Sequence, residues 1–191
     1  MLPQHVEVSF PFAAAEIVAM GLPGSVNGQA DHPLVSGLLH WLQVDHLAWR
    51  DYRSLSGGEQ QRVQLARVLA QVWLTSGPKL LLLDECTSAL DPAQQHRVMA
   101  LLASLARRGD FAVVAACHDL ALAATHVSRI WLMEYGRLVA DGIPEQVLSR
   151  DRLNRVYGVR AEVRRADGHP VVHVQGCSEP LPSADTVLAA L

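Results

Sequence analysis

The stretch "LSGGEQQR", Leu55 to Arg62, opens the segment that decides the fold. Ser56 and Glu59 have the spacing of a capping box, in which each side chain hydrogen-bonds the backbone of the other residue. Apolar residues then recur at helical spacing until "TSGPK" ends the run: Leu65, Ala66, Leu69, Val72 and Trp73. The sequence therefore predicts a long helix whose first turn carries two adjacent glycines.

Two apolar strands are predicted after this helix, and each delivers polar residues at its carboxyl end. "KLLLLDE" ends in Asp84 and Glu85, and "FAVVAAC" is followed by His118. Such continuous apolar runs are typical of strands buried on both faces of a parallel sheet, whose carboxyl edge binds ligands. Asp91-Pro92 predicts the start of a helix that ends before Gly109. The order of these segments predicts an α/β fold with a largely parallel sheet.

The flanking segments are expected to be short elements. "FAAAEIVAMG" predicts a short helix ended by Gly21, and Asp31 is expected to cap a helix that runs to about Gln43. After His118 we expect a short helix, a hairpin turning at residues 135–136, two more short helices and a closing hairpin around residues 167–168.

The composition narrows the class of protein. The chain has 191 residues, half of them hydrophobic, which is enough for one domain with a core, or one domain and a small appendage. Its net charge of -3 without a basic stripe argues against nucleic-acid binding. We find no apolar run long enough to span a bilayer and no cationic leader. Three scattered cysteines indicate neither a disulfide framework nor a metal site, as expected for a reducing cytosol.

Several of these residues have side chains suited to phosphate chemistry. A helix that begins Ser56-Gly57-Gly58 offers unpaired amides and close backbone approach to an anion. Asp84 is suited to hold Mg²⁺, Glu85 to accept a proton from water, and His118 to orient that water or donate to a phosphate oxygen. Taken singly, each feature also fits a structural role: a cap and turn, a solvated acidic turn, and a histidine at a strand end.

In combination and in this order, the segments resemble the ATP-binding cassette (ABC) family of ATPases. "LSGGEQQR" matches the family's signature motif, "LLLLDE" its Walker B motif, "SALD" its D-loop and "CHDL" its switch-histidine segment. "LPQ" at residues 2–4 looks like its Q-loop. The segments around the Q-loop and signature are most similar to the ATP-binding subunits of bacterial heme importers. The matching motifs run from residue 2 to residue 120.

The resemblance implies that two copies pair head to tail, with each ATP between the phosphate loop of one copy and the signature helix of the other. The residues that would contact the partner's nucleotide belong to the signature motif: Ser56, Gly57, Gly58, Glu59 and Gln60. Asp91 of the D-loop would reach across the dimer.

The same resemblance implies catalytic roles for residues at the strand ends and the Q-loop. Glu85 would be the general base, and His118 would bridge the γ-phosphate and the attacking water. Asp84 and Gln4 would serve Mg²⁺, with Gln4 also near that water. ATP and Mg²⁺ are therefore the expected cofactors.

The resemblance also implies transmembrane permease subunits as partners and a peripheral location on the cytoplasmic face of the bacterial inner membrane. Heme would be met only indirectly, through the permease. Five apolar residues after the Q-loop could line a groove for a permease helix, or equally pack in the core: Phe10, Phe12, Ile17, Val18 and Met20.

The sequence departs from the family pattern in two places. No G-x-x-x-x-G-K-[ST] phosphate loop occurs in it, so we expect the C-terminal part of an ABC ATPase, inactive alone and with exposed sheet edges. Cys86 stands where the family usually has proline, and it is expected to be a small buried side chain.

The expected organisation is one ATPase portion over residues 1–175 and a loosely attached tail over 176–191. Within the first we expect a helical subdomain at about 5–75, a core sheet at 76–135, and hairpins and helices at 136–175. Two other functions stay open. One is a soluble ABC ATPase of the DNA-repair type, although heptads and a basic face are absent from the sequence. The other is a non-enzymatic chain that modulates a full-length transporter ATPase.

Overall fold

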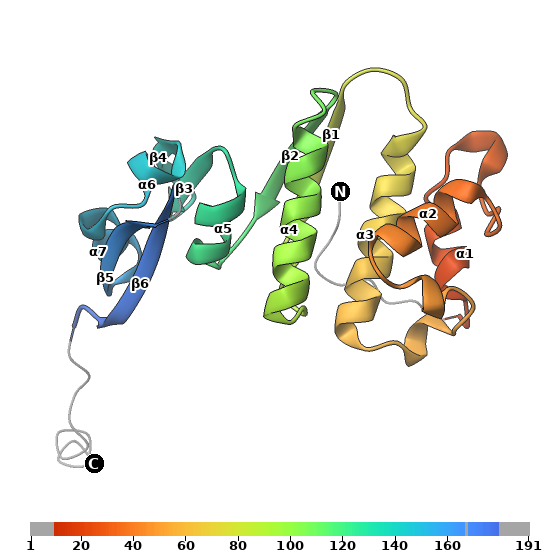
Figure 1. Ribbon diagram of the computed structural model, residues 1–191, viewed down its shortest axis with the longest axis horizontal. Coiled ribbons are helices and arrows are strands. Elements are labelled where there is room, and N and C mark those ends of the chain that lie inside the picture. Colours follow the sequence, from red (N-terminus) through yellow and green to blue (C-terminus); the bar gives the residue numbers. More distant parts are fainter. Residues whose placement is uncertain (1–9, 167, 180–191) are drawn as a thin grey trace, which may run out of the picture. The chain divides into compact units, whose positions relative to one another are not determined.

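The computed structural model describes residues 10–166 and 168–179 (Figure 1). The chain forms two compact units, the first ending at His118 and the second beginning at Asp119. Gln4 and the rest of the Q-loop lie outside the described residues, as does Asp167 of the last hairpin. The finer three-part division expected from the sequence stays a prediction.

The first unit begins with helices packed around α3 (Gly57–Trp73). α1 (Ala14–Ala19) and α2 (Pro33–Trp41) both contact α3, as Figure 1 shows, and three short 3₁₀ helices connect them: η1 (Gly24–Val26), η2 (Asp45–Leu47) and η3 (Tyr52–Ser54). The helix predicted from Ser56 is confirmed, and its middle is buried around most of its circumference: Val63, Leu65, Ala66, Val68, Leu69 and Ala70. Val72 and Trp73, near its end, are half-buried.

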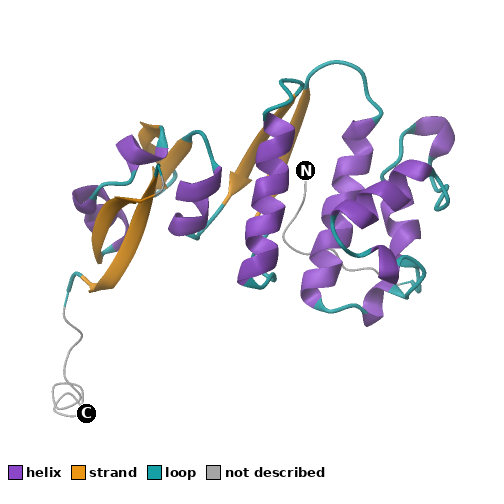
Figure 2. Cartoon of the chain, viewed as in Figure 1, coloured by secondary structure: helices purple, strands orange, loops and turns teal. Residues whose placement is uncertain are grey.

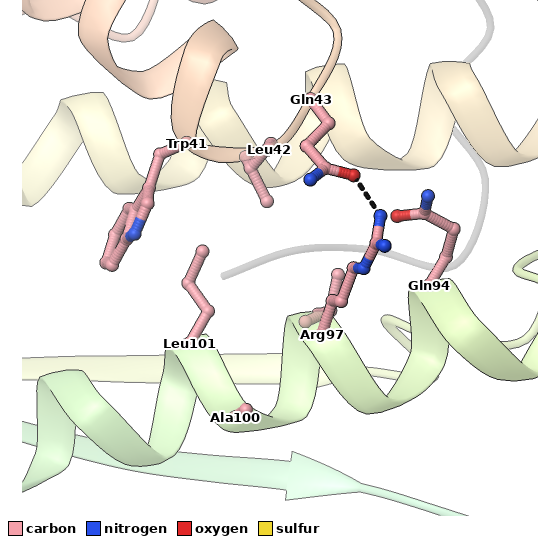
Figure 3. A pocket seen from close by; sticks show the side chains of 8 residues that line it. Trp41, Leu42, Gln43, Gln94, Arg97, Ala100 and Leu101 are labelled. Carbon is pink, nitrogen blue, oxygen red and sulfur yellow. Dashed lines mark hydrogen bonds between the residues drawn. The ribbon is translucent and has the colours of Figure 1, made fainter.

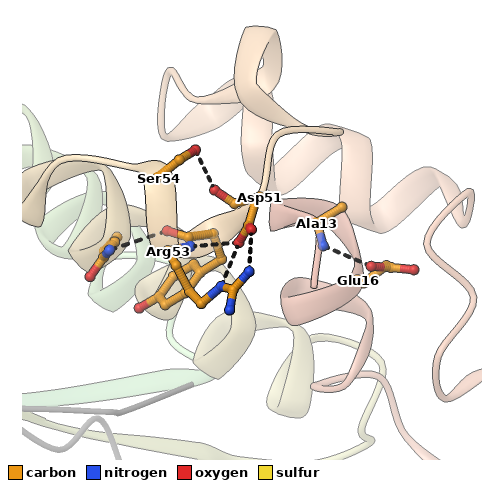
Figure 4. Close-up of polar contacts among 7 residues, drawn as sticks. Ala13, Glu16, Asp51, Arg53 and Ser54 are labelled. Atoms are coloured by element: carbon orange, nitrogen blue, oxygen red, sulfur yellow. Dashed lines mark hydrogen bonds and ion pairs between the residues drawn. The ribbon is translucent and has the colours of Figure 1, made fainter. Parts of the chain in front are cut away.

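A polar network fixes the segment that leads into α3 (Figure 4). Ala13 and Asp51 form a backbone bridge, and the Ala13 amide donates to the Glu16 carboxylate at 2.7 Å. The Asp51 carboxylate accepts from the Arg53 amide at 3.0 Å and pairs with its guanidinium at 2.7 Å, which lowers the pKa of Asp51. The Ser54 hydroxyl donates to the Asp51 carbonyl at 2.7 Å. These contacts connect the start of α1 to the segment that precedes α3.

The rest of the first unit is a small α/β layer. β1 (Lys79–Asp84) and β2 (Phe111–Ala116) pair in parallel, and α4 (Pro92–Ala106) lies between them in sequence and packs on β2. Asp91 caps α4 and Gly109 follows its end with φ 86°, as predicted. Trp73 of α3 contacts both Trp41 and Phe111, with ring centroids 5.6 and 5.9 Å away. Aromatic packing thus joins the helices to the strands.

The prediction that "KLLLLD" is buried on both faces is wrong for the described residues. Leu81 and Leu83 are buried, whereas Leu80 is 56% and Leu82 42% exposed. β1 therefore has one buried and one exposed face, and within the described residues it belongs to a two-stranded sheet. The parallel pairing of β1 with β2 agrees with the expected parallel core sheet, and the two antiparallel sheets are the two hairpins predicted after His118.

The cap predicted for α2 is also wrong. His32, not Asp31, is the N-cap, and its Nδ1 accepts from the Leu34 amide at 3.1 Å. Proline prefers the first helical position, so Pro33 places the cap at the residue directly before it. The helix ends at Trp41, because Gln43 already has a left-handed φ of 58°.

Among the described residues, the second unit has two hairpins and three short helices, which can be followed in Figure 2. In chain order they are α5 (Leu120–His126), β3 (Ile130–Glu134), β4 (Arg137–Gly142), α6 (Pro144–Val147), α7 (Arg150–Tyr157), β5 (Val159–Ala166) and β6 (His169–Cys177). The predicted turn of the first hairpin is confirmed, since Tyr135 and Gly136 have φ of 47° and 74°, as a tight mirror-image turn requires. The core of this unit contains Ala124, Leu148, Leu153 and Ala161.

Candidate functional site

The N-terminus of α3 has the capping box predicted from the sequence. The Ser56 amide and hydroxyl each donate to Glu59 Oε2 at 2.8 Å, and the Glu59 amide donates to the Ser56 hydroxyl at 3.4 Å. Gly57 and Gly58 are the first two helical residues, so their amides have no partner within the helix. These amides and the positive end of the helix dipole make the first turn of α3 attractive to an anion.

The two glycines have different surroundings. A Cβ built on Gly58 would lie 2.9 Å from the Ala89 carbonyl oxygen, closer than such atoms can approach. A Cβ on Gly57 would come no nearer than 3.8 Å to any other residue's atom, and Gly57 is exposed. Gly58 is therefore needed for packing against the loop after β1, whereas Gly57 is open to a ligand.

The structure brings Glu85 and His118 together at the carboxyl ends of the parallel strands. Asp84 and Ala116 are the last paired residues of β1 and β2, so the residues that follow emerge side by side. Glu85 Oε1 and His118 Nε2 are 2.6 Å apart, with Glu85 half-buried and His118 exposed. This pair can hold and move a proton next to solvent.

The other predicted site residues occupy varied positions. Asp84 is half-buried at the end of β1, and exposed Asp91 caps α4 by accepting from the Gln94 amide at 2.9 Å. The Gln60 side-chain amide donates to the Tyr52 and Leu55 carbonyls, both at 3.1 Å. It therefore fixes the segment directly before α3.

Gln61 is a further residue of this site, and it was not predicted from the sequence. Its Nε2 donates to the Glu85 carbonyl at 2.7 Å, and its Oε1 accepts from the Ala89 amide at 3.1 Å. The available signal was helical spacing, because residues three and four apart share a face and Gln61 follows Gly58 and Gly57 at those intervals. The partner loop is 24 residues away, which this spacing does not reveal.

Cys86 is a small buried side chain, as expected. It is 2% exposed, and burial, with a smaller contribution from neighbouring Cys117, raises the pKa of its thiol to about 12. Since the thiolate is the reactive form of cysteine, the Cys86 thiol is inert near neutral pH.

We expect Cys86 to resist alkylation in the folded chain while exposed Cys177 reacts. Iodoacetamide treatment at about pH 8, followed by peptide mass spectrometry, measures both thiols in one sample, with the denatured chain as control. Labelling of Cys86 at the rate of Cys177 in the folded chain would contradict the assignment.

Glu59 makes the cap sensitive to acid. Hydrogen bonds from the Ser56 backbone and then its hydroxyl lower the pKa of Glu59 below its ordinary 4.5. A carboxyl group with a lowered folded-state pKa stabilises the fold above its unfolded pKa and loses that contribution as pH falls through the folded value. The capping contribution should therefore be complete at neutral pH and should decline below about pH 4.5.

Glu59→Gln should make thermal stability less dependent on pH between about pH 5 and pH 3, because a neutral amide does not titrate there. Thermal midpoints across this range measure the effect, and exposed Glu145→Gln in the second unit is the control. If the thermal midpoints of wild type and Glu59→Gln depended on pH identically, the capping box would not respond to protonation of Glu59.

A groove of about 460 Å³ lies between the end of α2 and α4 (Figure 3). Trp41, Leu42 and Leu101 form its apolar walls, and Arg97 hydrogen-bonds the Gln43 side chain at its polar end. It shares no lining residue with Ser56–Gln60, Glu85 or His118. The groove is therefore separate from the candidate site.

Comparison with known proteins identifies the family. The sequence profile described as ABC transporter matches residues 1–88. The chain is 44% identical over 175 residues to the hemin import ATP-binding protein HmuV of Pseudomonas entomophila, covering 90% of this chain and 68% of that protein. The chain belongs to the ABC transporter family of ATP-binding proteins. HmuV of Pseudomonas aeruginosa is similar, with 43% identity and the same coverage of both chains.

Solved structures agree with this ABC assignment. A putative metal-chelate type ABC transporter in an inward-facing conformation matches with a TM-score of 0.73 and 27% identity, covering 92% of this chain and 71% of that one. The ATP-binding cassette MJ1267 matches with a TM-score of 0.59 at 21% identity, covering 76% of this chain and 62% of that one, which shows the shared fold. The predicted fold class is confirmed.

Membership confirms the resemblance drawn from the motifs and the enzyme class, an ABC-type transporter ATPase that binds nucleotide. The chain spans about two thirds of the length of the curated relatives it matches. No helix among the described residues is long and apolar enough to cross a membrane.

Proposed function

We propose that the chain acts in the ATP-binding subunit of a bacterial hemin importer, where ATP hydrolysis drives uptake. The observation that carries the ATPase role is the pairing of Glu85 with His118 at the strand ends, in contact through Gln61 with the signature helix. The hemin assignment rests on the names of relatives 42 to 44% identical to this chain. The same relatives favour an importer over a DNA-repair ATPase.

The signature helix fits one side of a triphosphate site. Gly57 and Gly58 supply amide donors at an exposed helix start, but Glu59 keeps a carboxylate in the same turn. A highly charged phosphate needs cationic and amide donors around it, and Ser56–Gln60 supplies amides but no cation. We infer that the main cradle comes from a second copy, as in the head-to-tail dimer that the resemblance implies.

The residues at the strand ends fit the hydrolytic side of such a site. Glu85 would accept the proton of the attacking water, and His118 would hold the carboxylate in place and donate toward the phosphate. Asp84 offers the oxygen ligand that Mg²⁺ prefers, and this ion commonly binds through one or two carboxylates plus substrate phosphates. Bound Mg²⁺ would neutralise charge that develops on the phosphate.

The permease would dock beside α1. Ile17 and Val18 are buried and belong to the core, whereas Phe10 and Met20 are exposed. Trp49 is exposed on the neighbouring segment, whose backbone carbonyls at Ala48 and Arg50 accept from the start of α1. These exposed apolar side chains fit a helix of a membrane subunit on the cytoplasmic face of the inner membrane, with the chain bound peripherally.

A capture experiment with the permease tests this function. The permease subunits of a hemin importer, reconstituted in nanodiscs, should retain the chain, and Trp49→Ala should weaken retention more than Trp131→Ala, an exposed tryptophan of the second unit. Supplying the phosphate-loop segment should then produce hemin-stimulated ATP turnover. Retention without any turnover would favour the modulating role, and no retention would refute the importer assignment.

A further inference from the structure

We propose that Gln61 is a positioning residue that connects the signature helix to Glu85, a role whose catalytic meaning rests on the proposed function. Both the nitrogen and the oxygen of the Gln61 side-chain amide form hydrogen bonds. Its Nε2 donates to the Glu85 carbonyl at 2.7 Å and lies 3.3 Å from the Ser88 hydroxyl, while its Oε1 accepts from the Ala89 amide at 3.1 Å. One side chain of α3 thus hydrogen-bonds the backbone of the loop that follows β1 at both Glu85 and Ala89.

The backbone of Glu85 needs such support. Its φ of 48° is left-handed, a conformation that non-glycine residues keep only when their surroundings hold them there. Its carbonyl accepts from the Ser88 amide at 3.2 Å and the Ser88 hydroxyl at 3.1 Å, both within the same turn. Gln61 adds the shortest of these bonds and brings it from α3.

The orientation of this backbone decides where the carboxylate points. Glu85 Oε1 lies 2.6 Å from His118 Nε2, so a rotation at Glu85 would separate the pair. A return to a right-handed φ, which an unsupported glutamate prefers, would be such a rotation. Gln61 therefore holds the Glu85 carboxylate against His118 through the Glu85 backbone.

The same loop contacts the start of α3 directly. The Ala89 carbonyl oxygen would lie 2.9 Å from a Cβ on Gly58, and the Ala89 amide donates to Gln61 one turn later. The loop is therefore in contact with α3 at both Gly58 and Gln61. In a head-to-tail dimer, phosphate at Gly57 and Gly58 belongs to one nucleotide and Glu85 serves the other, so Gln61 would couple the two sites, and such a coupling is reciprocal.

Nuclear magnetic resonance of the 191-residue chain tests this role without nucleotide. Gln61→Met keeps an unbranched side chain but removes its hydrogen bonds to the Glu85 carbonyl, the Ser88 hydroxyl and the Ala89 amide. We expect the Ala89 amide to exchange about tenfold faster, since one intramolecular hydrogen bond is lost. We also expect the Overhauser contacts between the Glu85 side chain and the His118 ring to disappear. Gln71→Met, at an exposed position of the same helix, should change neither.

A second variant separates the two bonds. Gln61→Glu retains an acceptor for the Ala89 amide but has no donor for the Glu85 carbonyl, so Ala89 should stay protected while the Glu85–His118 contacts are lost. Persistence of those contacts in Gln61→Met or Gln61→Glu overturns the proposal. Because these readouts involve no ATP, they are independent of whether the chain supports hydrolysis.

Discussion

ATP hydrolysis should appear when the phosphate-loop segment of a hemin import relative is supplied to this chain, and Glu85→Gln should lower its kcat by about 10²- to 10⁴-fold. A positioned general base contributes a factor of this size, and the glutamine side chain cannot accept the proton from water. The measurement is steady-state phosphate release by the co-expressed segments, with KM for ATP determined in parallel. The 191 residues alone should show no turnover.

Glu145→Gln is the matched control, because Glu145 is an exposed glutamate of α6 in the other unit. It should retain wild-type kcat. His118→Ala should also lower kcat, since the Glu85 carboxylate would lose the imidazole 2.6 Å away. Full activity of Glu85→Gln, or Glu85-dependent turnover by the chain alone, would refute the assignment of Glu85 as the base of a site completed by another segment.

Gly21→Ala should destabilise the helical part by about 2 to 3 kcal/mol, in the range of overpacked cores. A Cβ at Gly21 would lie 2.2 Å from the Arg67 carbonyl oxygen and 3.0 Å from the carbonyl carbon. Backbone atoms in the middle of α3 cannot rotate away as a flexible side chain can, so α1 would have to separate from α3. Urea unfolding followed by circular dichroism measures the change in the free energy of unfolding.

Gly37→Ala is the control for this substitution. Gly37 is an exposed residue inside α2, and a Cβ there would meet nothing within 4 Å. Alanine should stabilise that helix by about 0.5 to 1 kcal/mol, because glycine loses more conformational freedom when it becomes helical. Equal stability of Gly21→Ala and wild type would mean that α1 and α3 do not pack as the structure shows.

Local patterns in the sequence predicted much of the fold. The capping box at Ser56, the Asp91 cap and the turn at residues 135–136 are set by a few adjacent residues, and the structure has all three. The cap of α2 was missed because Pro33 fixes the helix start two residues after Asp31, so that His32 becomes the cap. Each success and this error are decided by short-range chemistry.

Burial and distant contacts could not be predicted in the same way. Four consecutive leucines indicate a strand but not how many faces are covered, and the exposure of Leu80 and Leu82 depends on what packs against β1. The Gln61–Glu85 contact joins residues 24 apart in the chain and has no local signature. The order of the polar strand ends did predict the neighbourhood of Glu85 and His118, because parallel strands end at one edge.

Photo-crosslinking with an ATP analogue that carries the reactive group on its γ-phosphate tests the central claim most directly. The chain would be mixed with a full-length hemin import ATP-binding relative, illuminated, and the labelled peptides of this chain identified by mass spectrometry. We expect label on residues 55–62, and we expect it to be lost when the phosphate-loop lysine of the relative is replaced. Label confined to other segments of this chain, or label at residues 55–62 that persists without that lysine, would contradict it.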